Sequence, residues 1–148
     1  MNPENILPFD RTHARTSSEP VKWWHTELLE HTHDAVIVWE LGGKGIIYWN
    51  RSAEILYGWR REETRGRITH ELLQTELTTG NPDDLENAIA RSGTWVGELQ
   101  HTTRTGKRIH VETRIVLLPS VDDREIVAEF NREITQRACR RRADDSPI

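Results

Sequence analysis

Cysteine is almost absent from this chain, and so are long apolar runs and any large excess of charge of one sign. The single cysteine, Cys139, excludes a disulfide within the chain. No apolar run approaches the ~18 residues that cross a membrane, and no apolar stretch follows the N-terminus as a signal peptide would. The net charge of −4 and the pI near 6.0 provide no positive field to attract nucleic acid or an anionic membrane. We therefore expect a cytoplasmic protein with neither of these partners.

The chain also lacks the motifs of catalytic, nucleotide and metal sites. It contains no nucleophile elbow, and the glycine-rich stretch 42–45 lies between two predicted strands with no helix after it to bind phosphate. The seven histidines are scattered, and His25 and His31 lack the i, i+3 or i+4 spacing that brings two imidazoles together on a helix. We expect no catalytic residue and no metal site, so any kinase or other enzymatic output would lie outside this chain.

The 148 residues suffice for one domain with tails. Residues 1–18 are rich in Pro, Thr, Arg and Ser without apolar periodicity and are predicted to be a flexible leader. A flanking helix is predicted within residues 19–33, the main domain spans 34–135, and 136–148 form a basic C-terminal tail.

The flanking helix is amphipathic, with apolar residues recurring at i, i+3 and i+7. Its apolar face either covers the domain's own sheet or faces a second copy of the chain. We expect a homodimer, with three candidate dimer residues: Val21, Trp24 and Leu28.

The segment that follows has the pattern of a hairpin and a short helix. Residues 35–39 and 46–49 are two β-branched or aromatic runs joined by a glycine-rich turn, which predicts paired strands. Asn50 suits a helix N-cap and Gly58 a C′ position, so a helix of about two turns is expected between them.

A second helix has the clearest boundary signals in the chain. Asn81 is a predicted N-cap, Pro82 occupies the first helical position and Gly93 lies just beyond the end. The stretch from Gly66 to Gly80 has weak periodicity and is expected to be short helix and loop.

The hairpin after Gly93 allows two registers. A two-residue turn would place Glu112 opposite Leu99, whereas a three-residue loop, 104–106, places Val111 there. We choose the second, because it puts apolar residues on one buried face. A final strand, 124–131, is then expected to point Ile126, Ala128 and Phe130 inward and Glu129 and Asn131 outward.

Together these pieces resemble a Per-Arnt-Sim (PAS) domain, the sensor module of bacterial histidine kinases and related two-component signalling proteins. The resemblance covers roughly residues 21–136, and Glu133 stands where the family usually has Asp. Four segments carry it by their order and spacing: Trp49-Asn50 leading into the helix 53–57, the turn 57–59 with Glu62, Glu63 and Gly66, the hairpin entry 93–98, and Glu133-Ile134-Thr135.

The resemblance implies an α+β fold, a five-stranded antiparallel sheet with short helices on one face, enclosing a pocket for a small molecule or cofactor. Its function would be to sense a ligand or redox state and to regulate an effector such as a histidine kinase. Ordinary core packing explains the same residues and is more frequent than ligand contact. The candidate pocket lining is Val36, Val38, Leu56, Leu85, Ile89, Trp95, Leu99, Val111, Ile115, Ala128 and Phe130.

The cofactor classes of the family can be tested against this sequence. Haem-binding members supply an axial histidine from the helix that here spans 82–92, which has none, and flavin photoreceptors need a cysteine just after the turn 57–59. Haem and a covalent flavin adduct are therefore disfavoured, whereas a non-covalent flavin or a small metabolite fits. The alternative function is a pure protein-interaction module with a side-chain-filled interior. The resemblance also implies a signal junction formed by Glu133 and Thr135, with Arg132 as an ion-pair partner suggested by the sequence.

Overall fold

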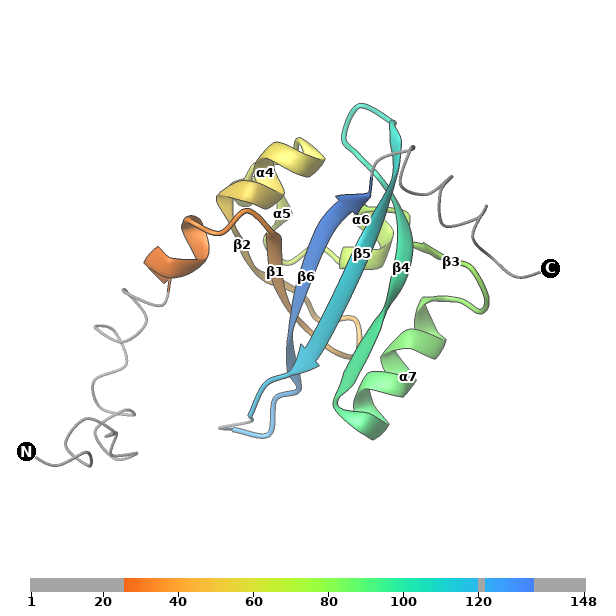
Figure 1. Cartoon of the computed structure of the whole chain (residues 1–148). Helices are drawn as coiled ribbons and strands as arrows, with labels where there is room; N and C mark the ends of the chain where they lie inside the picture. The colour runs from red at the N-terminus through yellow and green to blue at the C-terminus, as the bar shows by residue number, and fades with distance from the viewer. Residues whose placement is uncertain (1–25, 120–121, 135–148) are drawn as a thin grey trace, which may run out of the picture. The chain divides into compact units, whose positions relative to one another are not determined.

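The computed structural model describes residues 26–119 and 122–134 (Figure 1). Residues 26–30 are helical, and His31 Nε2 lies 3.3 Å from Glu27 Oε2, one helical turn away. Leu28 is the one predicted dimer residue in this segment, and it is 61% exposed. Val21 and Trp24, like the predicted leader and basic tail, lie outside the described residues.

The main body, from His33 onward, is built on an antiparallel sheet of six strands in the order β2-β1-β6-β5-β4-β3. The prediction of five strands lacked β3, a two-residue strand that pairs with the middle of β4. The strands are β1 (Ala35–Glu40), β2 (Gly45–Trp49), β3 (Glu76–Leu77), β4 (Thr94–Thr102), β5 (Arg108–Leu117) and β6 (Ile126–Ile134).

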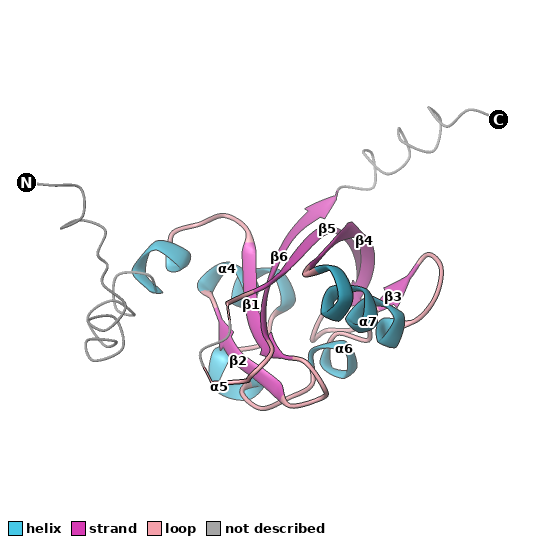
Figure 2. Ribbon diagram, turned by 90° about the horizontal axis from the view of Figure 1, so that it is seen from below, coloured by secondary structure: helices cyan, strands magenta, loops and turns pink. Residues whose placement is uncertain are grey.

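Short helices cover one face of this sheet (Figure 2). Their apolar residues, among them Ala53, Leu72 and Ile89, form one buried cluster with residues of the strands. The predicted α+β class is confirmed. The helices are α4 (Arg51–Tyr57), α5 (Arg61–Thr64), α6 (Thr69–Leu72) and α7 (Pro82–Ser92).

The helix boundaries follow from the predicted capping residues. Asn50 Oδ1 accepts hydrogen bonds from the backbone N–H of Ala53 and of Val36, each at 2.9 Å, so one side chain begins α4 and fastens it to β1. Asn81 likewise caps α7. Gly58 and Gly93 end the two helices at φ of +85° and +84°, a left-handed conformation that favours glycine.

The β4–β5 hairpin has the predicted three-residue loop. Val111 lies opposite Leu99, and Ile115 lies opposite Trp95. Gly97 leaves room for the neighbouring indole, because a Cβ on Gly97 would lie 2.6 Å from Trp95 Cη2.

The prediction for the last strand is wrong in two respects. β6 continues to Ile134, three residues beyond the predicted end. Its inward residues are Val127, Glu129 and Asn131, while Phe130 lies on the opposite, outer face. The two polar residues can face inward because their side chains are hydrogen-bonded there.

Strand pairing shows that the inner and outer residues of β1 are also exchanged relative to the prediction. Val36 pairs with Phe130 and Val38 with Ala128, so these four predicted pocket residues share the outer face of the sheet, as does Ile126 by its position in β6. The inner positions of β1 belong instead to its alternate residues, Ala35, Ile37 and Trp39.

None of the described helices is long and apolar enough to cross a membrane.

Candidate functional site

A chain of hydrogen bonds crosses the inner face of the sheet from β1 through β6 to β5. Trp39 Nε1 donates to Glu129 Oε1 at 2.8 Å, and Asn131 Nδ2 donates to Glu129 Oε2 at 2.9 Å. Thr113 Oγ1 then donates to Asn131 Oδ1 at 2.7 Å. Burial raises the pKa of the Glu129 carboxyl, although the bonds from Asn131 and Trp39 and the nearby His70 oppose this rise.

A second buried polar pair joins α4 to β4. Tyr57 Oη lies 2.7 Å from His101 Nδ1, and both side chains are fully buried. Burial lowers the pKa of His101 to about 3 and raises that of Tyr57 well above its ordinary value. Both groups are therefore neutral near pH 7.

Several atoms of this interior have no hydrogen-bond partner among the described residues. They include His101 Nε2 and Thr75 Oγ1. The pairing of Glu76 with Gln100, continued by one residue, places Thr75 opposite His101. Because buried polar atoms are nearly always hydrogen-bonded, His101 Nε2 and Thr75 Oγ1 are the atoms of this interior that an ordered water or another small polar group would be expected to contact.

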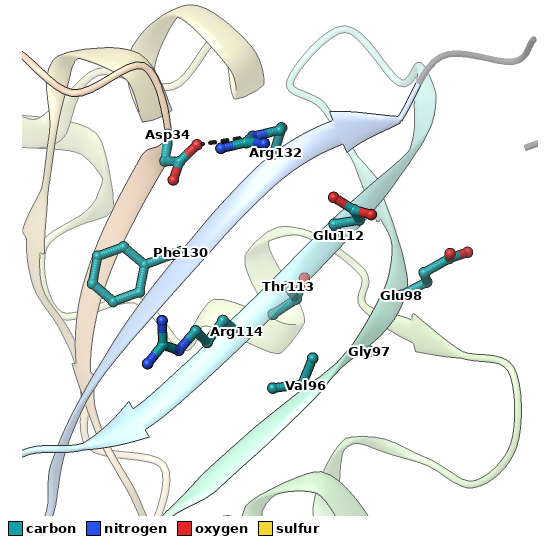
Figure 3. Close-up of a pocket in the computed structure, with 9 residues that line it drawn as sticks. All are labelled: Asp34, Val96, Gly97, Glu98, Glu112, Thr113, Arg114, Phe130 and Arg132. Carbon is teal, nitrogen blue, oxygen red and sulfur yellow. Dashed lines mark hydrogen bonds and ion pairs between the residues drawn. The ribbon is translucent and has the colours of Figure 1, made fainter. Parts of the chain in front are cut away.

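The outer face of the sheet carries an open groove of about 710 Å³ (Figure 3). Arg132 of β6 reaches to Asp34, just before β1, with Nε 3.2 Å from Oδ1. Glu112 lies opposite both Glu98 and Arg132 on the neighbouring strands. The groove is lined by Asp34, Val96, Gly97, Glu98, Glu112, Thr113, Arg114, Phe130 and Arg132.

This architecture, with helices over one face of an antiparallel sheet, can be compared with known proteins. Residues 26–132 match the family model described as PAS fold. The chain belongs to the PAS family. No curated protein matches it.

Solved PAS domains share this fold. The PAS domain of a protein from Colwellia psychrerythraea is 24% identical with a TM-score of 0.63, and the match covers 78% of this chain and 98% of that one. A PAS domain from a two-component sensor histidine kinase is 15% identical with a TM-score of 0.67, covering 80% and 100%. That of nitrogen regulation protein NR(II) from Vibrio parahaemolyticus is 17% identical with a TM-score of 0.63, covering 74% and 97%. At these identities the likeness shows the fold alone.

The predicted pocket lining of this PAS domain is divided between the two faces of the sheet. Val36, Val38, Ala128 and Phe130 lie on the outer face, as described above. The other seven belong to the core between sheet and helices: Leu56, Leu85, Ile89, Trp95, Leu99, Val111 and Ile115.

The predicted signal junction lies at the end of β6. Arg132 and Glu133 are exposed, and Thr135 lies outside the described residues. Arg132 pairs with Asp34, just before β1, so the beginning and the end of the PAS sheet are joined at this point.

The polar interior is not evident from the sequence. The alternating pattern of β6 predicts that Glu129 and Asn131 point outward, because a polar residue in an alternating strand is usually exposed. A usable signal was Trp39, since a buried indole N–H requires an acceptor. The helical spacing predicts Tyr57 on the buried face of its helix, but no local pattern marks His101 as its partner.

The described residues contain no group of three or more His, Cys, Asp or Glu side chains that could hold a metal ion.

Proposed function

We propose that this PAS domain is a sensory signal-transduction module that binds a small ligand, or responds to redox state, between its sheet and its helices. The supporting observation is that the fully buried Nε2 of His101 has no hydrogen-bond partner in the part of the chain that the structure describes. The ligand classes that we propose are a small polar metabolite and a non-covalent flavin. We further propose a cytoplasmic location and an effector, such as a histidine kinase, whose catalytic activity lies outside this chain.

The signal would leave the domain through β6. Glu129 and Asn131 of this strand face the interior, and the same strand continues to Arg132 and its ion pair with Asp34. A ligand that rearranges the inner hydrogen bonds would shift β6, and with it the junction formed by Arg132, Glu133 and Thr135. We propose this junction as the link to the effector.

The alternative is a pure protein-interaction module, possible because large side chains fill much of the interior. Trp49, Tyr57 and Leu73 are each at most 1% exposed. The outer face then supplies the binding surface, with the 72% exposed Val96 and the aromatic Phe130 among charged residues. A homodimer is compatible with either function.

Extraction of the purified protein separates the two functions. The protein is denatured, and the supernatant is analysed by absorbance and mass spectrometry. We expect a stoichiometric small molecule from the wild type and its loss in His101→Phe, which removes the inner imidazole. His110→Phe is the matched control, because His110 is exposed on the other face of the same hairpin. No compound from the wild type would favour the interaction module.

Light scattering at tens of micromolar tests the homodimer. We expect the mass of two chains, reduced by Trp24→Ala. A monomer that Trp24→Ala leaves unchanged would exclude the proposed dimer.

A further inference from the structure

One carboxylate of α7 contacts two other elements. Glu86 Oε1 accepts a hydrogen bond of 3.2 Å from the backbone N–H of Gly42, in the turn between β1 and β2. Its Oε2 lies 3.3 Å from His70 Nε2, in α6. The side chains of His70 and Glu86 are only 10% and 21% exposed. A single side chain therefore connects α7 to both the β1–β2 turn and α6.

The same histidine contacts the buried polar chain. The His70 ring meets the Trp39 ring edge-on, with centroids 5.1 Å apart and planes at 76°. Trp39 in turn donates its indole N–H to Glu129. A continuous set of contacts thus runs from the partly exposed Glu86 to the buried Glu129.

The contact between His70 and Glu86 depends on the charge of the imidazole. Its distance is that of an ion pair, but neither ring nitrogen of His70 has a hydrogen bond of good geometry among the described residues. Histidine is the side chain that ordinarily changes charge between pH 5 and 8. Only the imidazolium is attracted to a carboxylate by its full charge.

We infer that His70 and Glu86 form a pH-dependent tie, which fastens α6 to α7 and to the β1–β2 turn when His70 is protonated and loosens when it is neutral. Through the ring contact with Trp39, the same event changes the indole bond to Glu129. The tie requires neither a ligand nor an effector, so it stands or fails independently of the proposed function.

The charged groups around His70 are compatible with a tie that forms when His70 is protonated. Glu86 of α7 and Glu40 of β1, which line the same small cavity, attract an imidazolium. Glu129 of β6 attracts it only when ionised, because burial raises the pKa of its carboxyl. The negative charge of Glu40 is largely compensated by two cations. Arg124 Nη2 lies 2.9 Å from its Oε1, and Lys44 Nζ lies 3.8 Å from its Oε2. A cationic His101 of β4 would repel His70, but its pKa of about 3 keeps it neutral between pH 5 and 8.

Two N–H groups report directly on the tie in a ¹⁵N–¹H NMR titration from pH 5 to 8. They are the amide of Gly42 and the indole N–H of Trp39. We expect the Gly42 signal to move in the wild type and to stay still in His70→Gln. The Trp39 signal should lose the part of its movement that shares the Gly42 midpoint, because Glu129, which accepts from the indole, can also move it. The matched control is His110→Gln, which should leave both movements intact. A still Gly42 signal in the wild type, or Gly42 movement that survives His70→Gln, would overturn the inference.

Two further measurements cover the remaining outcomes. In Glu129→Gln the Gly42 signal should still titrate, and its loss would mean that Glu129, not His70, is the titrating group. If His70→Gln does not fold, the imidazole nitrogens of wild-type His70 are followed directly. Their midpoint must equal that of Gly42, and a different midpoint would refute the tie.

Hydrogen exchange measures the mechanical effect. After correction for intrinsic rates, we expect the amides of α7 to open about two- to fivefold less often at pH 5.5 than at pH 8, as for a modest ion pair. Glu86→Gln should abolish this ratio, and an unchanged ratio in that variant would contradict the inference.

Discussion

The buried carboxylate of Glu129 makes the stability of this domain depend on pH in a defined direction. Its pKa in the folded state is raised above the ordinary value of 4.5, mainly by burial. The folded state therefore holds the proton more strongly than the unfolded state does. The resulting stabilisation is fully present below the unfolded pKa and is lost as pH rises through the folded pKa.

Glu129→Gln removes this dependence while preserving the shape of the side chain. Trp39 can still donate to the amide oxygen, and Asn131 can turn its amide over to accept from the new amide and donate to Thr113. We expect the unfolding free energies of variant and wild type to agree within about 1 kcal/mol near pH 4.5. Above that pH the variant gains relative stability, by at most about 1.4 kcal/mol per pH unit, until the folded pKa is passed.

Urea unfolding at four pH values from 4.5 to 7.5, followed by tryptophan fluorescence, measures this difference. Because Glu129 and His70 interact, the midpoint belongs to the pair and not to one residue. The matched control is Glu133→Gln, an exposed carboxylate on the same strand, which should show no such trend. A difference that stays constant with pH, or that decreases as pH rises, would refute the reasoning.

Three other predictions follow from the interior and the hairpin. Tyr57→Phe should cost about 1–3 kcal/mol in denaturant unfolding, because His101 Nδ1 loses its buried partner; a loss below about 0.5 kcal/mol would mean that this bond contributes little. The pKa of His101 is lowered in the folded state, so the free energy of unfolding should decrease as pH falls from about 6.5 towards 3. A smaller acid-induced decrease in His101→Gln than in the wild type would show this, and equal decreases would count against it. Gly97→Ala should cost about 1–3 kcal/mol by displacing the Trp95 indole and much less in a Trp95→Ala background; additive costs would exclude the indole contact as the cause.

Local signals in the sequence were sufficient for the helices and the long hairpin. Asn50 and Asn81 satisfy backbone donors at the first turn of their helices, and Gly58 and Gly93 adopt the left-handed conformation at the ends, so each boundary depends on residues close in sequence. The hairpin register followed from matching apolar residues across a short loop.

Local signals do not determine which residues of β1 and β6 face the interior. In β1 both alternate sets of residues are apolar, so a period of two does not distinguish Ile37 from Val38. In β6 the inward Glu129 is stabilised by Trp39, 90 residues away in the sequence, and such a bond leaves no local pattern. The inward-facing positions were therefore predicted correctly for the helices and the hairpin but not for β1 and β6.

The most direct test of the sensory account compares amide NMR spectra of the protein as purified and after unfolding, dialysis and refolding to strip any bound molecule. The account predicts shifts at residues around His101 and Glu129, which continue along β6 to Arg132 and Ile134, and their reversal when the extract is returned. Identical spectra before and after stripping, or shifts confined to the outer groove, would contradict it.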